Sequence, residues 1–185
     1  LATARKKAAQ LGFQPRLIQS DMSAFHLDRR YGLIVIAFNA FLHNLTAETQ
    51  LSTLACCRQH LLPDGILAFD TSFPGTAWVT APDNVRVFEC EMKHPVTNLP
   101  VRLYDTRSFD RVRQIQRSEN EMELLDAEGK ITQTFRSQTS IRWIYKSEME
   151  LLLRLTGFRK WEIYGNFERQ PLERETDMQI VQAWN

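Results

Sequence analysis

Two apolar runs separated by one helical segment constrain the fold more than any other feature of this chain. Residues 33–38 (LIVIAF) are continuously apolar, which is typical of a central strand covered on both faces in a parallel sheet. Residues 66–73 (ILAFDTSF) form a second strand pattern. Strand, helix, turn and strand therefore follow one another within about forty residues, which predicts a βαβ unit with a right-handed crossover.

The segment between these runs predicts a helix over residues 46–62. Thr46 suits the N-cap, and Glu48 suits the positively polarised first turn. The sequence Pro-Asp-Gly at residues 63–65 is expected to stop the helix. We expect the helix to pack on the sheet through one apolar stripe, formed by Leu51, Leu54, Ala55, Leu61 and Leu62.

The pattern changes after residue 84. Apolar and polar residues alternate in four segments between residues 85 and 145. This period of two predicts antiparallel strands, with a hairpin at residues 126–129 (DAEG). We therefore interpret residues 85–145 as an antiparallel β insertion.

Helical and strand patterns return at the end of the chain. Ser147 opens a candidate capping box, and Gly157 is placed to end the helix that follows. Near the other end of the chain, residues 1–11 have the pattern of a helix ended by Gly12. We expect an α/β core at residues 1–84, the insertion at residues 85–145, and a final helix with two strands at residues 146–185.

Composition narrows the choice of partner. The net charge is +1, from 23 basic and 22 acidic residues, so no overall field draws the chain to nucleic acid or to an anionic membrane. No apolar run reaches the roughly 18 to 20 residues that cross a bilayer, and residues 1–10 lack the apolar core of a signal peptide. We expect a cytoplasmic protein with a small-molecule partner, without a nucleic-acid or membrane partner, and leave a homo-oligomer open.

The three cysteines indicate neither a disulfide framework nor a metal site. Cys56, Cys57 and Cys90 are odd in number and contain no CxxC pair. We interpret them as buried thiols and expect no bound metal.

Four stretches occur in an informative order. They are residues 18–22 (IQSDM), 33–43 (LIVIAFNAFLH), 61–67 (LLPDGIL), and 151–158 (LLLRLTGF) followed by 164–167 (YGNF). In this order they resemble the class I S-adenosylmethionine-dependent methyltransferases, in the subgroup that acts on small molecules and has an antiparallel insertion. The resemblance implies a Rossmann-like α/β sheet, S-adenosylmethionine as cofactor, and methyl transfer to a nitrogen or oxygen nucleophile of a small molecule.

The resemblance also implies a cofactor site. In the family, the acidic residue after the third strand accepts a hydrogen bond from the adenine amino group, and Asp21 matches it, with Met22 beside the ring. Phe38, Asn39 and Ala40 end a strand at the edge where open α/β sheets bind ligands, so they are candidates for the methionine portion. The alternatives are that Asp21 caps a turn, Asn39 makes a turn and Phe38 belongs to the core.

Three residues are candidate catalytic groups. A general base is needed only when the nucleophile must lose a proton, and His43, Asp70 and Tyr104 are the candidates. The alternatives are that His43 bonds to backbone groups near its helix and that Asp70 makes a strand-end hydrogen bond to the following loop.

Phe41, Arg107 and Arg142 are candidate substrate-binding residues. Arg107 belongs to a polar group with Tyr104 and Asp105 that is suited to orienting a substrate. The alternatives are a core position for Phe41 and a solvated one for Arg142, which alternation places opposite Trp143.

Two family features do not occur in this sequence. The chain contains no glycine-rich GxGxG loop, and the acidic residue that holds the ribose hydroxyls is absent. We therefore expect the sequence to start in the helix after the second strand, so that the N-terminal strands of the Rossmann-like sheet are absent. Two alternatives stay open, a non-catalytic methyltransferase-like interaction subunit and a nicotinamide-dependent dehydrogenase.

Overall fold

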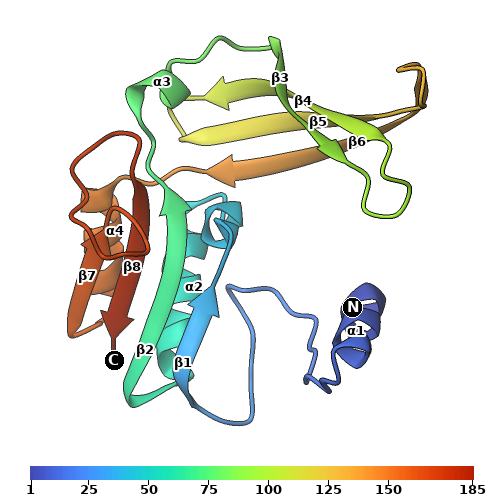
Figure 1. Ribbon diagram of the computed structural model, residues 1–185. Helices are drawn as coiled ribbons and strands as arrows, with labels where there is room; N and C mark the ends of the chain where they lie inside the picture. The colour runs from blue at the N-terminus through green and yellow to red at the C-terminus, as the bar shows by residue number, and fades with distance from the viewer.

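A computed structural model describes residues 1–185 and contains two four-stranded sheets (Figure 1). The first sheet has the strand order β1-β2-β8-β7, and the second has the order β3-β4-β5-β6. The second sheet lies across the ends at which β1 and β2 finish. This arrangement places an antiparallel layer over the carboxyl edge of the main sheet.

The predicted βαβ unit is confirmed. Strands β1 (Tyr31–Ile36) and β2 (Leu61–Ser72) are parallel neighbours, and helix α2 (Ala47–Gln59) connects them. Thr46 caps this helix, because its hydroxyl accepts a hydrogen bond from the backbone N–H of Thr49 at 3.1 Å. The order of strand and helix was therefore readable from apolar periodicity alone.

The predicted end of α2 was wrong. The helix stops at Gln59, and Leu61 and Leu62 belong to β2. His60 ends the helix, because its ring Nδ1 bonds to the carbonyl of Cys56 at 2.8 Å and its Nε2 accepts the N–H of Leu27 at 3.0 Å. His60 therefore connects the last turn of α2 to the loop before β1. The spacing of apolar residues along the helix does not reveal such a contact.

Gly65 lies within β2 and allows a close approach to β1. A Cβ atom at this position would lie 2.9 Å from the carbonyl oxygen of Tyr31. The Pro-Asp-Gly sequence therefore serves strand pairing in this fold and does not end the helix.

Two antiparallel strands complete the main sheet. Strand β8 (Met178–Trp184) pairs with β2 on one side and with β7 (Lys160–Tyr164) on the other. Helix α4 (Lys146–Leu155) precedes β7 and is followed by Gly157 at φ 83°, as predicted.

The predicted capping box at Ser147 is not formed. Helix α4 begins one residue earlier, at Lys146, and its N-cap Tyr145 provides no side-chain cap. Glu150, which would have completed the box three residues after Ser147, instead forms a local ion pair with Lys146 at 2.6 Å. Glu148, in the first turn, forms an ion pair with Arg142.

The core lies between the main sheet and the helices α2 and α4, which cover the same face (Figure 1). The opposite face of β1 is open: Leu33 and Val35 are 56% and 59% exposed. The expectation that both faces of this strand are covered was therefore wrong for this structure. The buried apolar residues are Phe41, Leu42, Leu54, Cys57, Leu61, Leu67, Phe69, Ile144, Met149, Leu152, Leu153, Phe158, Val181 and Ala183.

The cysteine thiols are free. Cys56 and Cys57 are buried in α2, and Cys90 is half-buried in β3. Burial raises the pKa of the Cys57 thiol to about 12. The interpretation as buried thiols is thus confirmed for the pair in α2.

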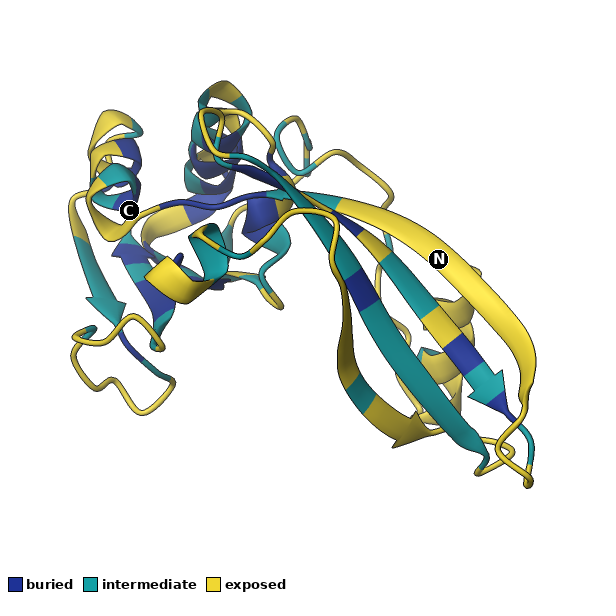
Figure 2. Ribbon diagram, turned by 90° about the horizontal axis from the view of Figure 1, so that it is seen from above, coloured by how far each residue is buried: buried dark blue, intermediate teal, exposed yellow.

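The predicted antiparallel insertion is also confirmed. It consists of β3 (Arg86–Lys93), β4 (Pro100–Asp110), β5 (Ile115–Leu125) and β6 (Ile131–Arg142), each antiparallel to the next. Figure 2 shows this sheet projecting away from the buried core, with most of β6 exposed. A short helix, α3 (Thr76–Val79), connects β2 to the insertion.

The first thirty residues contain one helix. Helix α1 (Ala2–Gln10) precedes Gly12, which has φ 74° as expected for a helix end, and none of its residues is buried. Residues 16–20 form no strand. No helix in the structure combines the length and the apolar character needed to cross a membrane.

Candidate functional site

A buried carboxylate joins the ends of β1 and β2. Asp70, near the end of β2, is 7% exposed. One of its oxygens accepts the backbone N–H of Phe38 and the other that of Asn39, each at 2.9 Å. Asp70 therefore makes strand-end hydrogen bonds, but to the loop after β1 and not to the loop that follows its own strand.

The loop held by Asp70 has an unusual backbone. Phe38 and Asn39 have φ values of 60° and 56°, in the left-handed region that asparagine adopts more readily than phenylalanine. The Oδ1 of Asn39 in turn accepts the N–H of Ser72 at 2.6 Å. Hydrogen bonds therefore run both from the β1 end to the β2 end and from the β2 end to the β1 end. Phe38, on this strained backbone, is 92% exposed. A core position for Phe38 is excluded.

Asp21 and Met22 approach the same edge from the loop before β1. Met22 Sδ accepts a hydrogen bond from the side chain of Asn44 at 3.2 Å, which places it beside the 3-10 helix η1 (Ala40–His43). Asp21 Oδ1 accepts the N–H and the hydroxyl of Ser23 at 2.8 and 2.7 Å. The turn role of Asp21 is therefore present, and its Oδ2 makes no hydrogen bond within the chain.

The hydrogen bonds from Ser23 have an electrostatic consequence. The Ser23 hydroxyl, followed by its backbone N–H, lowers the pKa of Asp21. The exposed carboxylate is ionised at neutral pH and can only accept hydrogen bonds. Oδ2 is thus suited to a donor such as an exocyclic amine.

His43 connects the main sheet to the insertion. Its Nδ1 lies 3.0 Å from the backbone carbonyl of Ser140 in β6, and because a carbonyl only accepts, this ring nitrogen carries the hydrogen. Nε2 of the exposed ring is then left as an acceptor. His43 therefore bonds to a backbone group in β6 and not to one near its own helix, and this contact orients the ring without occupying Nε2.

A cavity of about 270 Å³ lies between the carboxyl edge and the insertion. Asn39 and Leu42 line it from η1 and its N-cap, Ser72 from the end of β2, and Trp78 from α3. Strands β4, β5 and β6 contribute Arg107, Gln116 and Ile141.

Arg107 is the one charged residue that lines this cavity, and it is held by two carboxylates. Its Nε donates to Asp105 Oδ2 at 2.6 Å, and its terminal nitrogen donates to Glu89. Of the candidate substrate-binding residues, Arg107 alone lies at the cavity.

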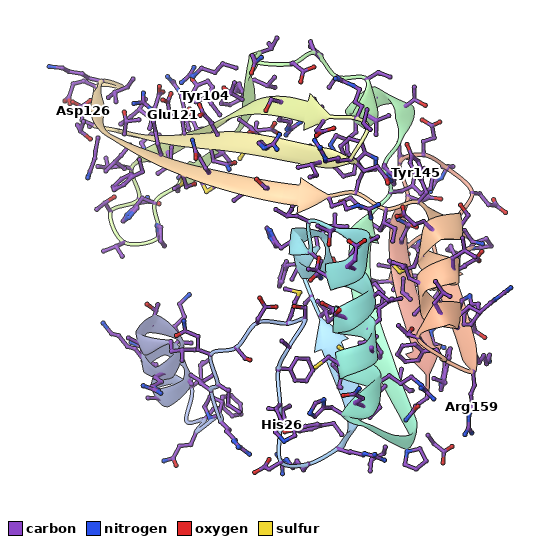
Figure 3. The ribbon with its side chains drawn as sticks, turned by 180° about the vertical axis from the view of Figure 1, so that it is seen from behind. His26, Tyr104, Glu121, Asp126, Tyr145 and Arg159 are labelled. Atoms are coloured by element: carbon purple, nitrogen blue, oxygen red, sulfur yellow. The ribbon has the colours of Figure 1, made fainter.

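Tyr104 does not lie at the cavity. Alternation along β4 directs it to the opposite face of the sheet from Asp105 and Arg107. There the Arg86 guanidinium lies 3.3 Å from the centroid of its ring and bonds to Glu121. Figure 3 shows Tyr104 and Glu121 toward the hairpin end of the insertion, away from the junction between the sheets. The structure therefore gives Tyr104 no place among the catalytic groups.

The structure also places Phe41 and Arg142 away from any ligand surface. Phe41 is fully buried and packs on Phe69, with ring centroids 4.9 Å apart. Arg142 is buried, not solvated, because β6 enters the core at this point; its guanidinium bonds to Gln50, Glu148 and Gln114 at 2.6, 2.6 and 2.8 Å. Both side chains are therefore occupied by contacts within the protein.

The structure thus joins residues that are far apart in the sequence. The strand-end loop, Asp70, His43 and Arg107 surround one edge, with Asp21 and Met22 beside it. Sequence reasoning missed five cavity residues. Leu42 lies in the stretch 33–43 but was not singled out, and Ser72, Trp78, Gln116 and Ile141 belong to none of the four stretches. No cluster of three or more His, Cys, Asp or Glu side chains suited to a metal ion occurs.

Comparisons with known proteins support the fold. No protein-family model and no curated protein matches the chain. Among solved structures, an S-adenosylmethionine-dependent methyltransferase from Clostridium acetobutylicum superposes with a TM-score of 0.80 at 16% identity, over 99% of this chain and 70% of that one. The CcbJ methyltransferase from Streptomyces caelestis gives a TM-score of 0.75 at 18% identity, over 99% of this chain and 69% of that one.

A third neighbour has a more specific description. The sugar N-methyltransferase KedS8 from Streptoalloteichus superposes with a TM-score of 0.68 at 15% identity, over 99% of this chain and 68% of that one. At these identities the likeness concerns the fold alone. The main sheet, the insertion across its carboxyl edge and these superpositions together show that the chain has the Rossmann-like fold of the class I S-adenosylmethionine-dependent methyltransferases.

Proposed function

We propose that the protein transfers a methyl group from S-adenosylmethionine to a nitrogen or oxygen nucleophile of a small molecule. The observation that carries this proposal is the cavity between the carboxyl edge and the insertion. Ligands of open α/β sheets bind at this edge, and a cavity with a few convergent polar groups is typical of a small-molecule site. The description of KedS8 as a sugar N-methyltransferase favours a nitrogen nucleophile on a sugar-like acceptor.

The residues at the edge fit the cofactor in chemical terms. Asp21 has an ionised carboxylate with one oxygen free to accept the adenine amino group, and Met22 offers an apolar surface beside it. At the end of β1, the exposed Phe38 side chain and the side-chain NH₂ of Asn39, which makes no hydrogen bond within the chain, are available to the methionine portion, with Ala40 beside them. The exposure of Phe38, on a strained backbone, is consistent with a ligand-facing position.

The cofactor supplies an electrophilic methyl group, so the chain mainly orients the acceptor and excludes water. Asp70 is a positioning residue, because it holds the strand-end loop through two backbone N–H groups. His43 Nε2 accepts the proton that an acceptor amine or hydroxyl loses, with the ring held by Ser140. The insertion lines one side of the cavity with Arg107, Gln116 and Ile141, and in this proposal it selects the acceptor.

Replacing Asp21 with asparagine tests the cofactor site. The amide oxygen of the new side chain can still accept from Ser23, whereas its NH₂ group would face the donor amine of adenine. We expect the dissociation constant for S-adenosylmethionine, measured by calorimetry, to rise about tenfold to a hundredfold, which corresponds to about 1 to 3 kcal/mol.

Asp28→Asn is the matched control, because Asp28 lies in the same loop and pairs only with the exposed Arg16. An unchanged dissociation constant in folded D21N would assign Asp21 to the turn alone. Binding of a nicotinamide dinucleotide in place of S-adenosylmethionine would favour a dehydrogenase, and binding of neither would favour a non-catalytic subunit.

A further inference from the structure

Helix α3 carries the one aromatic side chain that lines the cavity. Trp78 lies in this helix of four residues, which connects the end of β2 to the insertion (Figure 1). A helix this short is not stable by itself, because isolated helices of fewer than about 12 residues are marginal in water. Its N-cap, Gly75, also has no side chain to cap it. The position of Trp78 is therefore set by partners from outside the helix.

Glu175 holds the beginning of α3. Its two carboxylate oxygens accept the backbone N–H and the hydroxyl of Thr76 at 2.7 and 2.8 Å. A Cβ atom on Gly75 would lie 2.7 Å from the backbone carbonyl oxygen of Glu175, so the two backbones also pack closely. Glu175 belongs to the loop between β7 and β8, and the main sheet therefore fixes this end of the helix.

Arg111 holds the other end of α3. Its Nε donates to the carbonyl of Val79 at 2.9 Å, and one terminal nitrogen donates to the carbonyl of Ala81 at 2.8 Å. The second terminal nitrogen bonds to Asp83 at 2.8 Å, and Asp83 also accepts the N–H of Phe109 at 2.6 Å. Arg111 lies in the turn between β4 and β5, so the insertion fixes this end of the helix.

A hydrogen-bond chain of fixed polarity meets Trp78 at the cavity wall. The Ser118 hydroxyl donates to Asp105 at 3.2 Å and therefore accepts from the NH₂ group of Gln116 at 2.8 Å. The amide oxygen of Gln116 accepts the indole N–H of Trp78, a group that can only donate. Asp105 also accepts from Arg107, so the chain connects two residues that line the cavity. A displacement of α3 would break the bond at the indole.

We infer that Glu175 and Arg111 are positioning residues of the proposed acceptor cavity, which together place α3 so that Trp78 forms its aromatic wall. Both side chains are exposed, so each contributes little to the overall stability. Their contacts converge on a helix whose one contribution to the cavity is Trp78. The assignment of the cavity to the acceptor rests on the proposed function, whereas the position of Trp78 does not.

The indole N–H of Trp78 reports on this position directly. The chain contains four tryptophans, so a heteronuclear NMR spectrum shows four indole signals, and Trp78→Phe identifies the signal of Trp78. We expect Glu175→Ala and Arg111→Met each to shift this signal and to make its exchange with water about threefold to tenfold faster. The physical reason is that the bond to Gln116 is then formed for less of the time.

Matched controls lie beside each positioning residue. Glu173→Ala removes an exposed carboxylate from the same loop as Glu175, and Arg113→Met removes a 77% exposed guanidinium from the same turn as Arg111. Neither side chain bonds to α3, so the Trp78 signal should stay unchanged. Glu175→Gln is the conservative variant. Its amide still offers Thr76 an acceptor and a donor, so it should keep the signal of the unmodified protein.

Arg111→Lys and Thr76→Val each remove only part of the contacts, and they give the same reading if the larger changes do not fold. An unchanged Trp78 signal in the folded variants overturns the inference. An equal change in the signals of Trp161 and Trp184, in β7 and β8, also overturns it, because the whole protein would then be loosened. The dissociation constant for S-adenosylmethionine, measured by calorimetry, should stay the same in every variant. Failure of the unmodified protein to bind S-adenosylmethionine would instead contradict the proposed function and leave the position of Trp78 unaffected.

Discussion

Arg142→Met is expected to destabilise the protein by about 3 to 5 kcal/mol, the range for removing one partner of a buried ionic network. The buried guanidinium connects the end of β6 to Gln50 in α2 and to Glu148 in α4. Without the guanidinium, the Oε1 of the fully buried Gln50 loses its donor. The Nε2 of Gln50 has no hydrogen-bond partner even in the unmodified protein. The free energy of unfolding, measured by urea denaturation, should fall accordingly.

Arg136→Met is the control for this prediction. Arg136 lies on the same face of β6 and pairs with Glu121, but its side chain is 78% exposed. Such a pair contributes about 0 to 1 kcal/mol, so this variant should have nearly unchanged stability. Combining Arg142→Met with Gln50→Leu should recover part of the loss, because the buried amide is then removed. A stable Arg142→Met protein would show that the network is not needed to join the insertion to the core.

Asp70→Asn is the second change with a large expected effect. An amide NH₂ group would face the backbone N–H of Phe38 or Asn39, where a carboxylate oxygen now accepts. Losing one charge-assisted bond and creating a donor opposite a donor should lower the free energy of unfolding by about 2 to 4 kcal/mol. Because the freed loop is part of the proposed cofactor site, binding of S-adenosylmethionine should weaken as well.

Asp64→Asn is the matched control, because this exposed carboxylate lies near the other end of β2 and makes no ion pair. Asn39→Gly separates the contribution of the Asn39–Ser72 bond from that of the Asp70 bonds. Glycine keeps the left-handed backbone and loses only the bond to Ser72, so we expect about 1 kcal/mol of destabilisation. Wild-type stability and affinity in Asp70→Asn would contradict the positioning role.

The carboxyl-edge site was partly readable from the sequence. Asn39 was found because it follows a strand pattern and Asp70 because it lies at the end of one, and parallel strands bring their ends to one edge. Asp21 was found through the family resemblance. The cavity residues Trp78 and Gln116 carry no such signal. They meet only because the insertion folds back over the edge.

The choice between the two faces of the insertion lay beyond sequence reasoning. We took Tyr104, Asp105 and Arg107 as one polar group, whereas the pleat of β4 directs Tyr104 to the opposite face from the other two. Period two also does not say which face meets the main sheet. The structure turns Asp105 toward the cavity side and leaves Tyr104 with Arg86. Arg142 shows the same limit, because its buried ion pair with Glu148 took the place of the solvated position.

Local periodicity and turn chemistry by themselves determined the βαβ unit, the antiparallel insertion and the helix end at Gly157, because these depend on contacts between near neighbours in the sequence. Only the tertiary structure decided where α2 ends, which side chains meet at the carboxyl edge, and which carboxylate lies behind the cavity. Each of these depends on hydrogen bonds between distant residues, such as His60 with Leu27 and Asp70 with Phe38, and such pairings leave no periodic trace in the sequence.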